Sequence, residues 1–113
     1  MRAEISVDDF GRPLKIPLSF SLVGRARKIE GGSRRFQVKK YVGIVPSNSD
    51  GDKVVFLQEL EFEDGSKEFR LGYYIIGHRG RFKGKWAWGQ FAPFIPAEDL
   101  TKLMERAKEK GIL

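Results

Sequence analysis

The chain has 113 residues, of which 41% are hydrophobic and 32% charged, and its formal net charge is +6. This length and apolar content predict one folded domain over residues 1–113 rather than a disordered chain. The absence of cysteine excludes structural disulfides, thiol catalysis and thiolate metal sites. We find no apolar leader in the first residues, and no run near the roughly 20 apolar residues of a membrane-spanning helix. The sequence therefore predicts a cytoplasmic protein that does not enter a membrane.

The charges are segregated along the chain. Residues 25–41 hold seven basic side chains and one acid, and residues 69–91 hold five basic side chains and no acid. Between them, residues 50–68 hold seven acids against two lysines. A basic excess of this kind favours an anionic partner, although it carries no information about the fold.

The first predicted strand follows a short N-terminal segment. Residues 1–12 are expected to form either a loose arm or a short strand. From Leu14 onward, apolar and polar residues alternate, which predicts a strand that continues to about residue 29. Pro17 lies within this run and cannot donate a backbone hydrogen bond, so the strand is expected at an edge or at a bulge. The glycines of "EGGS" then predict a hairpin turn.

Four further strands are expected before residue 92. Three of them cover residues 35–45, 53–63 and 68–76 and are separated by the turn sequences "PSNSDGD" and "EDGSK". In the first of these, Phe36, Val38, Val42 and Ile44 are expected to share one buried face, with Lys40 interrupting it. A loop and a last strand over residues 85–91 complete the series.

After Pro96 the apolar period changes from that of a strand to that of a helix. Apolar residues follow the spacing i, i+3, i+4, i+7, which predicts a helix over about residues 97–110. The residues that carry this spacing are Leu100, Leu103, Met104 and Ala107. The predicted fold is therefore α+β and mostly β: a curved antiparallel meander, or a small barrel or half-barrel, of five or more strands with one C-terminal helix.

The stretch "GHRGRFKGKWAWGQ", residues 77–90, combines glycines, basic residues and both tryptophans without any acid. If this hairpin binds nucleic acid, its cations would neutralise phosphates and its aromatic rings would stack on bases. The alternative is that Trp86 and Trp88 cover the core or receive the terminal helix. The predicted phosphate contacts are Arg79, Arg81, Lys83 and Lys85, and the predicted stacking residues are Trp86, Trp88 or Tyr74.

The other basic segment, "RARKIEGGSRRFQVKK", is predicted to form one hairpin. Its candidate phosphate contacts are Arg25, Arg27, Arg34 and Arg35. The alternative is an edge hairpin whose cations prevent aggregation, which is a common use of lysine and arginine in β-proteins. One continuous phosphate-binding surface would require both basic segments to lie on one face.

We recognise no catalytic, nucleotide-binding or metal-binding motif. His78 is the sole histidine, and no sequence neighbour completes a metal site or a catalytic dyad with it. The segment "NSDGDK" alternates possible oxygen ligands, but Lys53 stands where a calcium loop of the EF-hand type requires glycine. We therefore expect no cofactor and no metal, and a binding protein rather than an enzyme.

Two functions remain open. The first is a non-catalytic module for RNA or single-stranded DNA, because no predicted helix is basic enough to enter a major groove. The second is a module for protein–protein interaction or homo-oligomerisation, favoured by the aromatic residues of "WAWGQFAPFIP" and by unprotected strand edges. A ligand-binding or enzymatic role at a barrel mouth has less support, because no motif accompanies it.

Overall fold

The structure is a computed structural model that describes residues 4–19, 26–28, 35–89 and 91–113. These residues form seven strands, one short 3-10 turn and one α-helix. The elements are β1 (Glu4–Val7), β2 (Pro13–Ser19), β3 (Ala26–Lys28), β4 (Arg35–Ile44), β5 (Lys53–Phe62), β6 (Lys67–Ile76), η1 (Gly80–Phe82), β7 (Trp86–Trp88) and α1 (Ala97–Glu109).

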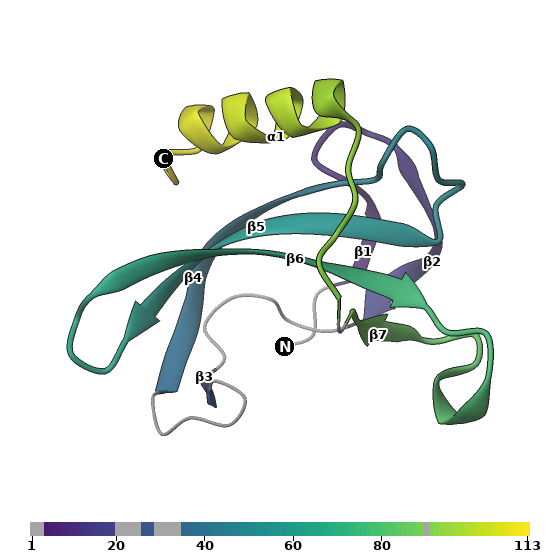
Figure 1. Cartoon of the computed structure of the whole chain (residues 1–113), viewed down its shortest axis with the longest axis horizontal. Coiled ribbons are helices and arrows are strands. Elements are labelled where there is room, and N and C mark those ends of the chain that lie inside the picture. The colour runs from purple at the N-terminus through teal and green to yellow at the C-terminus, as the bar shows by residue number, and fades with distance from the viewer. Residues whose placement is uncertain (1–3, 20–25, 29–34, 90) are drawn as a thin grey trace.

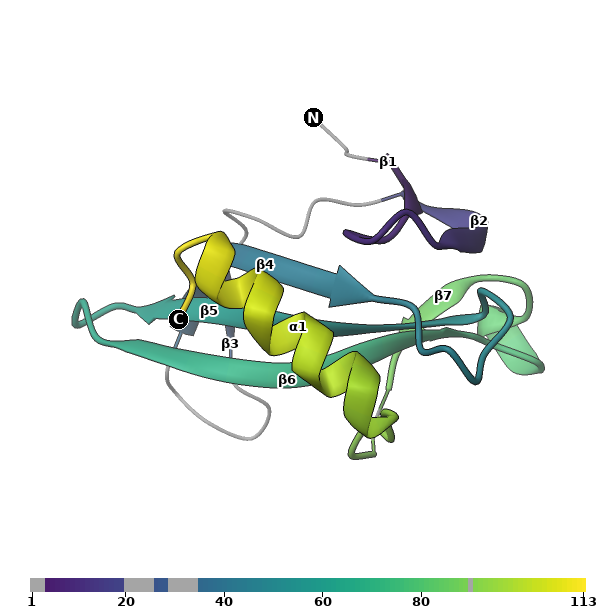
Figure 2. The same cartoon turned by 90° about the horizontal axis from the view of Figure 1, so that it is seen from above.

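The strands form two antiparallel sheets. β1 pairs with β2, and β3 to β7 form a five-stranded meander in which each strand pairs with its neighbour in the sequence. The long strands β4, β5 and β6 curve together beneath α1 (Figure 1), and α1 crosses them diagonally (Figure 2). The predicted mostly-β α+β meander with a C-terminal helix is therefore confirmed. Among the described residues β3 and β7 end the sheet order and do not pair with each other, so this meander does not close into a barrel.

The strand predicted to run from residue 14 to about residue 29 is not one strand. Its first part is β2, which belongs to the two-stranded sheet, and its last part is β3, which belongs to the meander. The predicted turn "EGGS" lies outside the described residues. Alternation alone could not separate the two strands, because both parts follow the same period.

The prediction that Phe36, Val38, Val42 and Ile44 share one face is wrong, because β4 contains a β-bulge. The pairing of β4 with β5 shifts between Val38, which is opposite Leu60, and Lys40, which is opposite Glu59. One extra residue reverses the side of the sheet to which later side chains point. Phe36 and Val38 consequently pack with Leu60 and Phe62, whereas the two later apolar residues of β4 point to the other face.

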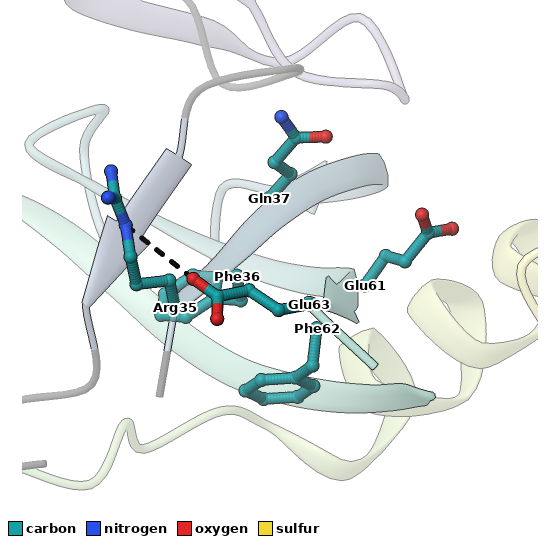
Figure 3. A pocket seen from close by; sticks show the side chains of 6 residues that line it. All are labelled: Arg35, Phe36, Gln37, Glu61, Phe62 and Glu63. Carbon is teal, nitrogen blue, oxygen red and sulfur yellow. Dashed lines mark ion pairs between the residues drawn. The ribbon is translucent and has the colours of Figure 1, made fainter. Parts of the chain in front are cut away.

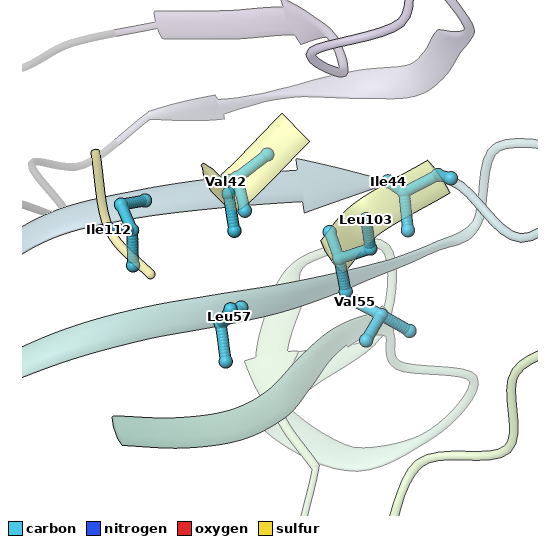
Figure 4. Packing of buried hydrophobic residues seen from close by; sticks show 7 residues of the cluster. Val42, Ile44, Val55, Leu57, Leu103 and Ile112 are labelled. Carbon is cyan, nitrogen blue, oxygen red and sulfur yellow. The ribbon is translucent and has the colours of Figure 1, made fainter. Parts of the chain in front are cut away.

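That other face is covered by α1. Val42 and Ile44 from β4 and Val55 and Leu57 from β5 pack against Leu103, Ala107 and Ile112 (Figure 4). Leu103 and Ala107 are fully buried, as the helical period predicts, whereas Leu100 is partly exposed. Burial of a leucine side chain of this kind contributes about 1.5–3 kcal/mol. Among the described residues no helix is long and apolar enough to cross a membrane.

The two-stranded sheet covers part of the opposite face of the meander. Leu14 and Leu18 from β2 pack with Val54 and Phe56 from β5 and with Tyr74 from β6. The first half of β5 is therefore buried on both faces, between α1 on one side and β2 on the other. This explains its nearly continuous apolar sequence "VVFL", which is typical of a central strand.

A buried carboxylate joins the connection between β1 and β2 to the end of β4. Asp8 accepts hydrogen bonds from the backbone N–H groups of Phe10 and Arg12, both at 2.8 Å, through one oxygen. Its other oxygen accepts the N–H of Val45 at 2.6 Å. Three buried or partly buried backbone donors are thus satisfied by one side chain, which fixes the connection against the sheet.

A second buried carboxylate joins the same connection to α1. Asp99, fully buried in the first turn of α1, accepts the backbone N–H of Ser47 at 2.7 Å and the Arg12 guanidinium at 3.0 Å. The same Arg12 nitrogen donates to the carbonyl of Val45 at 2.6 Å. Burial alone would raise the pKa of Asp99, but the hydrogen bonds from Ser47 and Arg12 outweigh it and hold that pKa below its usual value.

Asp99→Asn is expected to destabilise the protein by about 3 kcal/mol, because the amide cannot accept both donors and leaves Arg12 without its charge partner. Because the pKa of Asp99 is lowered on folding, its stabilisation is present above the unfolded value of about 4 and is lost as the pH falls below it. The variant should therefore also show a weaker loss of stability in acid, measured by urea unfolding across pH. The control Asp50→Asn removes only the exposed ion pair with Lys15 and should cost less than about 1 kcal/mol. Equal losses in the two variants would contradict the anchoring role of Asp99.

Candidate nucleic-acid interface

The loop between β6 and β7 is a compact turn closed by its own backbone. The N–H of Gly77 donates to the carbonyl of Lys85 at 2.9 Å, and the N–H of Gly84 donates to the carbonyl of Gly77 at 3.0 Å. Within the loop, the N–H of Lys83 donates to the carbonyl of Gly80 at 3.1 Å. Gly84 has a φ of +71°, which residues with a side chain rarely adopt. The loop therefore projects its side chains from a well-defined backbone.

The four cations of this loop are exposed and unpaired. They are Arg79, Arg81, Lys83 and Lys85, and none of them forms an ion pair in the described part of the chain. Phe82 lies among them with 42% of its surface exposed, and the Arg81 guanidinium lies over its ring, 5.0 Å from the ring centre. Cations without acidic neighbours create a local positive potential that attracts phosphate groups. Phe82 was missed by the sequence analysis, although its position between two basic residues was visible there.

The two tryptophans lie on the face opposite α1, and different groups cover them. Trp86 is half-buried against the core, and its indole N–H donates to the carbonyl of Ile16 at 3.0 Å. Trp88 is 36% exposed, and its ring lies directly on Gly72, where any Cβ would collide with it. Trp86 thus covers the core, which was one of the two roles expected from the sequence. Trp88 retains an accessible surface. Neither lies on the face that receives α1.

Tyr74, the third predicted stacking residue, is a core residue. Its ring is buried and lies edge-on between Phe56, with ring centres 6.1 Å apart, and Trp88, with ring centres 5.0 Å apart. A buried ring cannot present a face to a base, so we leave Tyr74 out of the candidate interface.

Arg70 is a residue of this face that the sequence analysis did not single out. Its guanidinium donates from Nε and Nη2 to the buried amide oxygen of Gln58, at 3.0 and 2.7 Å. The same guanidinium lies over the rings of Trp88, at 4.5 Å, and Phe36, at 5.0 Å. Gln58 therefore fixes Arg70, and Arg70 in turn fixes the orientation of Trp88. Its position on β6 was predictable, but its aromatic neighbours Phe36 and Trp88 come from β4 and β7, which lie on opposite sides of β6 in the sheet.

The other predicted basic segment is only partly described. Arg25 and Arg34 lie outside the described residues, and Arg27 lies on β3 opposite Phe36. Arg35, at the start of β4, is exposed and pairs with Glu63, with 4.0 Å between Nε and the carboxylate oxygen. The predicted hairpin is supported by the pairing of β3 with β4, but Arg35, the candidate contact whose side chain the structure describes, has an acidic neighbour.

A hollow of about 300 Å³ at this end of the sheet carries mixed charge. Figure 3 shows it lined by Arg35, Phe36 and Gln37 from β4, and by Glu61, Phe62 and Glu63 from the end of β5 and the turn after it. Two carboxylates on its rim would repel a phosphate. We therefore exclude this hollow from the candidate interface.

The β6–β7 loop and the start of β4 lie at opposite ends of the sheet (Figure 1). β6 spans ten residues between them, and at about 3.3 Å per residue this corresponds to roughly 30 Å. The described cations therefore do not form one compact patch, and the loop with Trp88 is the coherent part of the predicted site.

His78 is exposed in the same loop. Among the described residues, no group of three or more His, Cys, Asp or Glu side chains could hold a metal ion. No protein-family model matches the chain, and no curated protein or solved structure is significantly similar to it.

Proposed function

We propose that this protein binds single-stranded RNA or DNA through the β6–β7 loop and Trp88. The observation that carries this proposal is a set of four exposed cations in one backbone-closed loop around the exposed ring of Phe82. None of the four forms an ion pair with another described residue. A polyanion would gain phosphate contacts there without displacing an existing ion pair. The loop leads directly into β7, so Trp88 follows the last of these cations by only three residues.

Aromatic rings between cations favour single strands over duplexes. Bases can stack on Phe82 or Trp88 only when they are unpaired. Duplex recognition in the major groove commonly uses a basic helix, and α1 alternates cations with Glu98, Glu105 and Glu109. The charge of the loop is therefore better suited to the backbone of a flexible strand.

Neutralising two loop cations should weaken binding and reduce its salt dependence. For Arg79→Gln/Arg81→Gln we expect at least about a tenfold loss of affinity for labelled oligo(U) or oligo(dT) at low salt. The slope of log affinity against log salt should fall by about 1.4, because each phosphate contact on a single strand contributes about 0.7. Fluorescence anisotropy across a salt titration measures both quantities.

The matched control for this charge change is Lys102→Gln/Lys108→Gln, which removes two exposed cations from α1. This variant should bind almost as tightly as the wild type. Equal losses in both variants would mean that only the net charge matters, and no binding by the wild type at about 50 mM salt would overturn the proposal.

The aromatic residues should contribute affinity that does not depend on salt. Phe82→Ala and Trp88→Ala are each expected to cost about 1–3 kcal/mol of binding free energy while leaving the salt slope unchanged. Trp86→Phe provides the comparison, because it loses the hydrogen bond to Ile16 and should affect stability rather than binding. Wild-type affinity in both alanine variants would remove base stacking from the proposal.

A further inference from the structure

Over about half of its length, one edge of β6 pairs with no other strand among the described residues. β7 pairs with Tyr74 to Ile76, and the N–H of Gly89 donates to the carbonyl of Tyr73 at 2.8 Å. From residue 67 to residue 72, β6 has β5 on one side and no described strand on the other. The end of β6 next to the β5–β6 turn also extends beyond α1 (Figure 2).

The backbone groups at this edge belong to alternate residues. The carbonyl of Tyr73 points toward β7, whereas the N–H of Ile76 points to the opposite side, where it donates to Asp52 at 3.0 Å. Because this direction alternates along a strand, Lys67, Phe69 and Leu71 direct their N–H and C=O groups away from β5. None of these three residues has another partner in the described part of the chain.

The same edge carries exposed apolar side chains. Phe69 is 47% and Leu71 37% exposed. An edge strand with unpaired backbone groups and apolar side chains readily pairs with another strand.

We propose that β6 pairs antiparallel with β6 of a second copy of this chain, about a two-fold axis at Phe69. This arrangement joins the two five-stranded sheets into one continuous sheet and leaves no unpaired length of β6 between the hairpin turn and β7. It places Phe69 opposite Phe69 of the second copy, and Lys67 opposite Leu71. The inference concerns assembly and stands independently of nucleic-acid binding.

The charges of β6 select this register. An axis at Glu68 would place two glutamates directly opposite each other, and an axis at Arg70 would place two arginines opposite each other. An axis at Phe69 places Glu68 of each copy opposite Arg70 of the other, and opposite charges in such positions are favourable. The axis at Phe69 also lets the backbone groups of Lys67, Phe69 and Leu71 all form hydrogen bonds with the second copy. An axis at Arg70 would instead bring Lys67 opposite Tyr73, whose carbonyl already accepts the N–H of Gly89.

A second copy is favoured over an unrelated strand because this self-complementarity comes from one five-residue sequence, "KEFRL". A two-fold contact buries this edge of both partners at once, so that no further copy can pair at the same edge.

Light scattering on the purified chain across a range of concentrations tests the association. We expect a species of twice the 12.9 kDa chain mass that dissociates on dilution. Glu68→Arg should be monomeric at low salt, because it places arginines opposite each other, while Glu105→Arg, with the same charge change on the exposed side of α1, should remain dimeric. A monomeric wild type at every concentration would overturn the proposal, and so would a Glu68→Arg variant that dimerises as well as the wild type with unchanged circular dichroism.

Single cysteines test the register, because the chain contains none. Directly opposed residues of a hydrogen-bonded antiparallel pair have Cα atoms about 5.5 Å apart, within the range of a disulfide. Phe69→Cys should therefore form a covalent dimer on mild oxidation, whereas Glu68→Cys and Arg70→Cys should not. Cross-linking through position 68 or 70 in preference to 69 would overturn the proposed axis. Both experiments measure the mass of the protein in the absence of nucleic acid, so their results do not depend on the proposed binding function.

Discussion

The hydrogen bonds to two buried carboxylates hold the layers of this protein together. Asp8 accepts donors from its own connection and from the end of β4, and Asp99 accepts donors from Ser47 and from Arg12. These contacts link the two-stranded sheet, the meander and the first turn of α1, which the apolar contacts alone would leave free to slide. Because hydrogen bonds are directional, the carboxylates specify one relative placement of the three layers. The two-stranded sheet and α1 therefore keep fixed positions on opposite faces of the meander that carries the β6–β7 loop.

Within this frame, the cations differ in what surrounds them. Arg12 is used inside the fold, Arg35 lies beside Glu63, and Arg70 is held by Gln58 between aromatic rings. The cations of the β6–β7 loop form no ion pair in the described part of the chain, and the ring contact of Arg81 is with Phe82 of the same loop. These cations form no contacts with other described residues that stabilise the fold, and their loop is closed by its own backbone hydrogen bonds. Binding of an external anion is the role that best explains such charges. The edge of β6 at Lys67, Phe69 and Leu71 is the corresponding feature for assembly, because its backbone groups have no partner in the described part of the chain.

Local patterns predicted the elements well, and their long-range relations poorly. The central strands and the helix begin and end within about two residues of their predicted limits, because alternation, turn residues and helical spacing are local signals. The bulge near Lys39 was not visible, since the apolar residues before and after it keep the same spacing and only their faces change. The different roles of Trp86 and Trp88 depend on β2, which lies far away in the sequence. The four loop cations were predictable from composition, whereas the burial of Tyr74 and the contacts of Arg70 required the order of the strands.

The most direct measurement is a heteronuclear NMR titration of the labelled protein with unlabelled oligo(U). Our account predicts that amide shifts will concentrate in residues 77–89, with the indole of Trp88 among the most affected signals and α1 largely unchanged. A response centred on the start of β4 and the end of β5, or no response at low salt, would contradict the account.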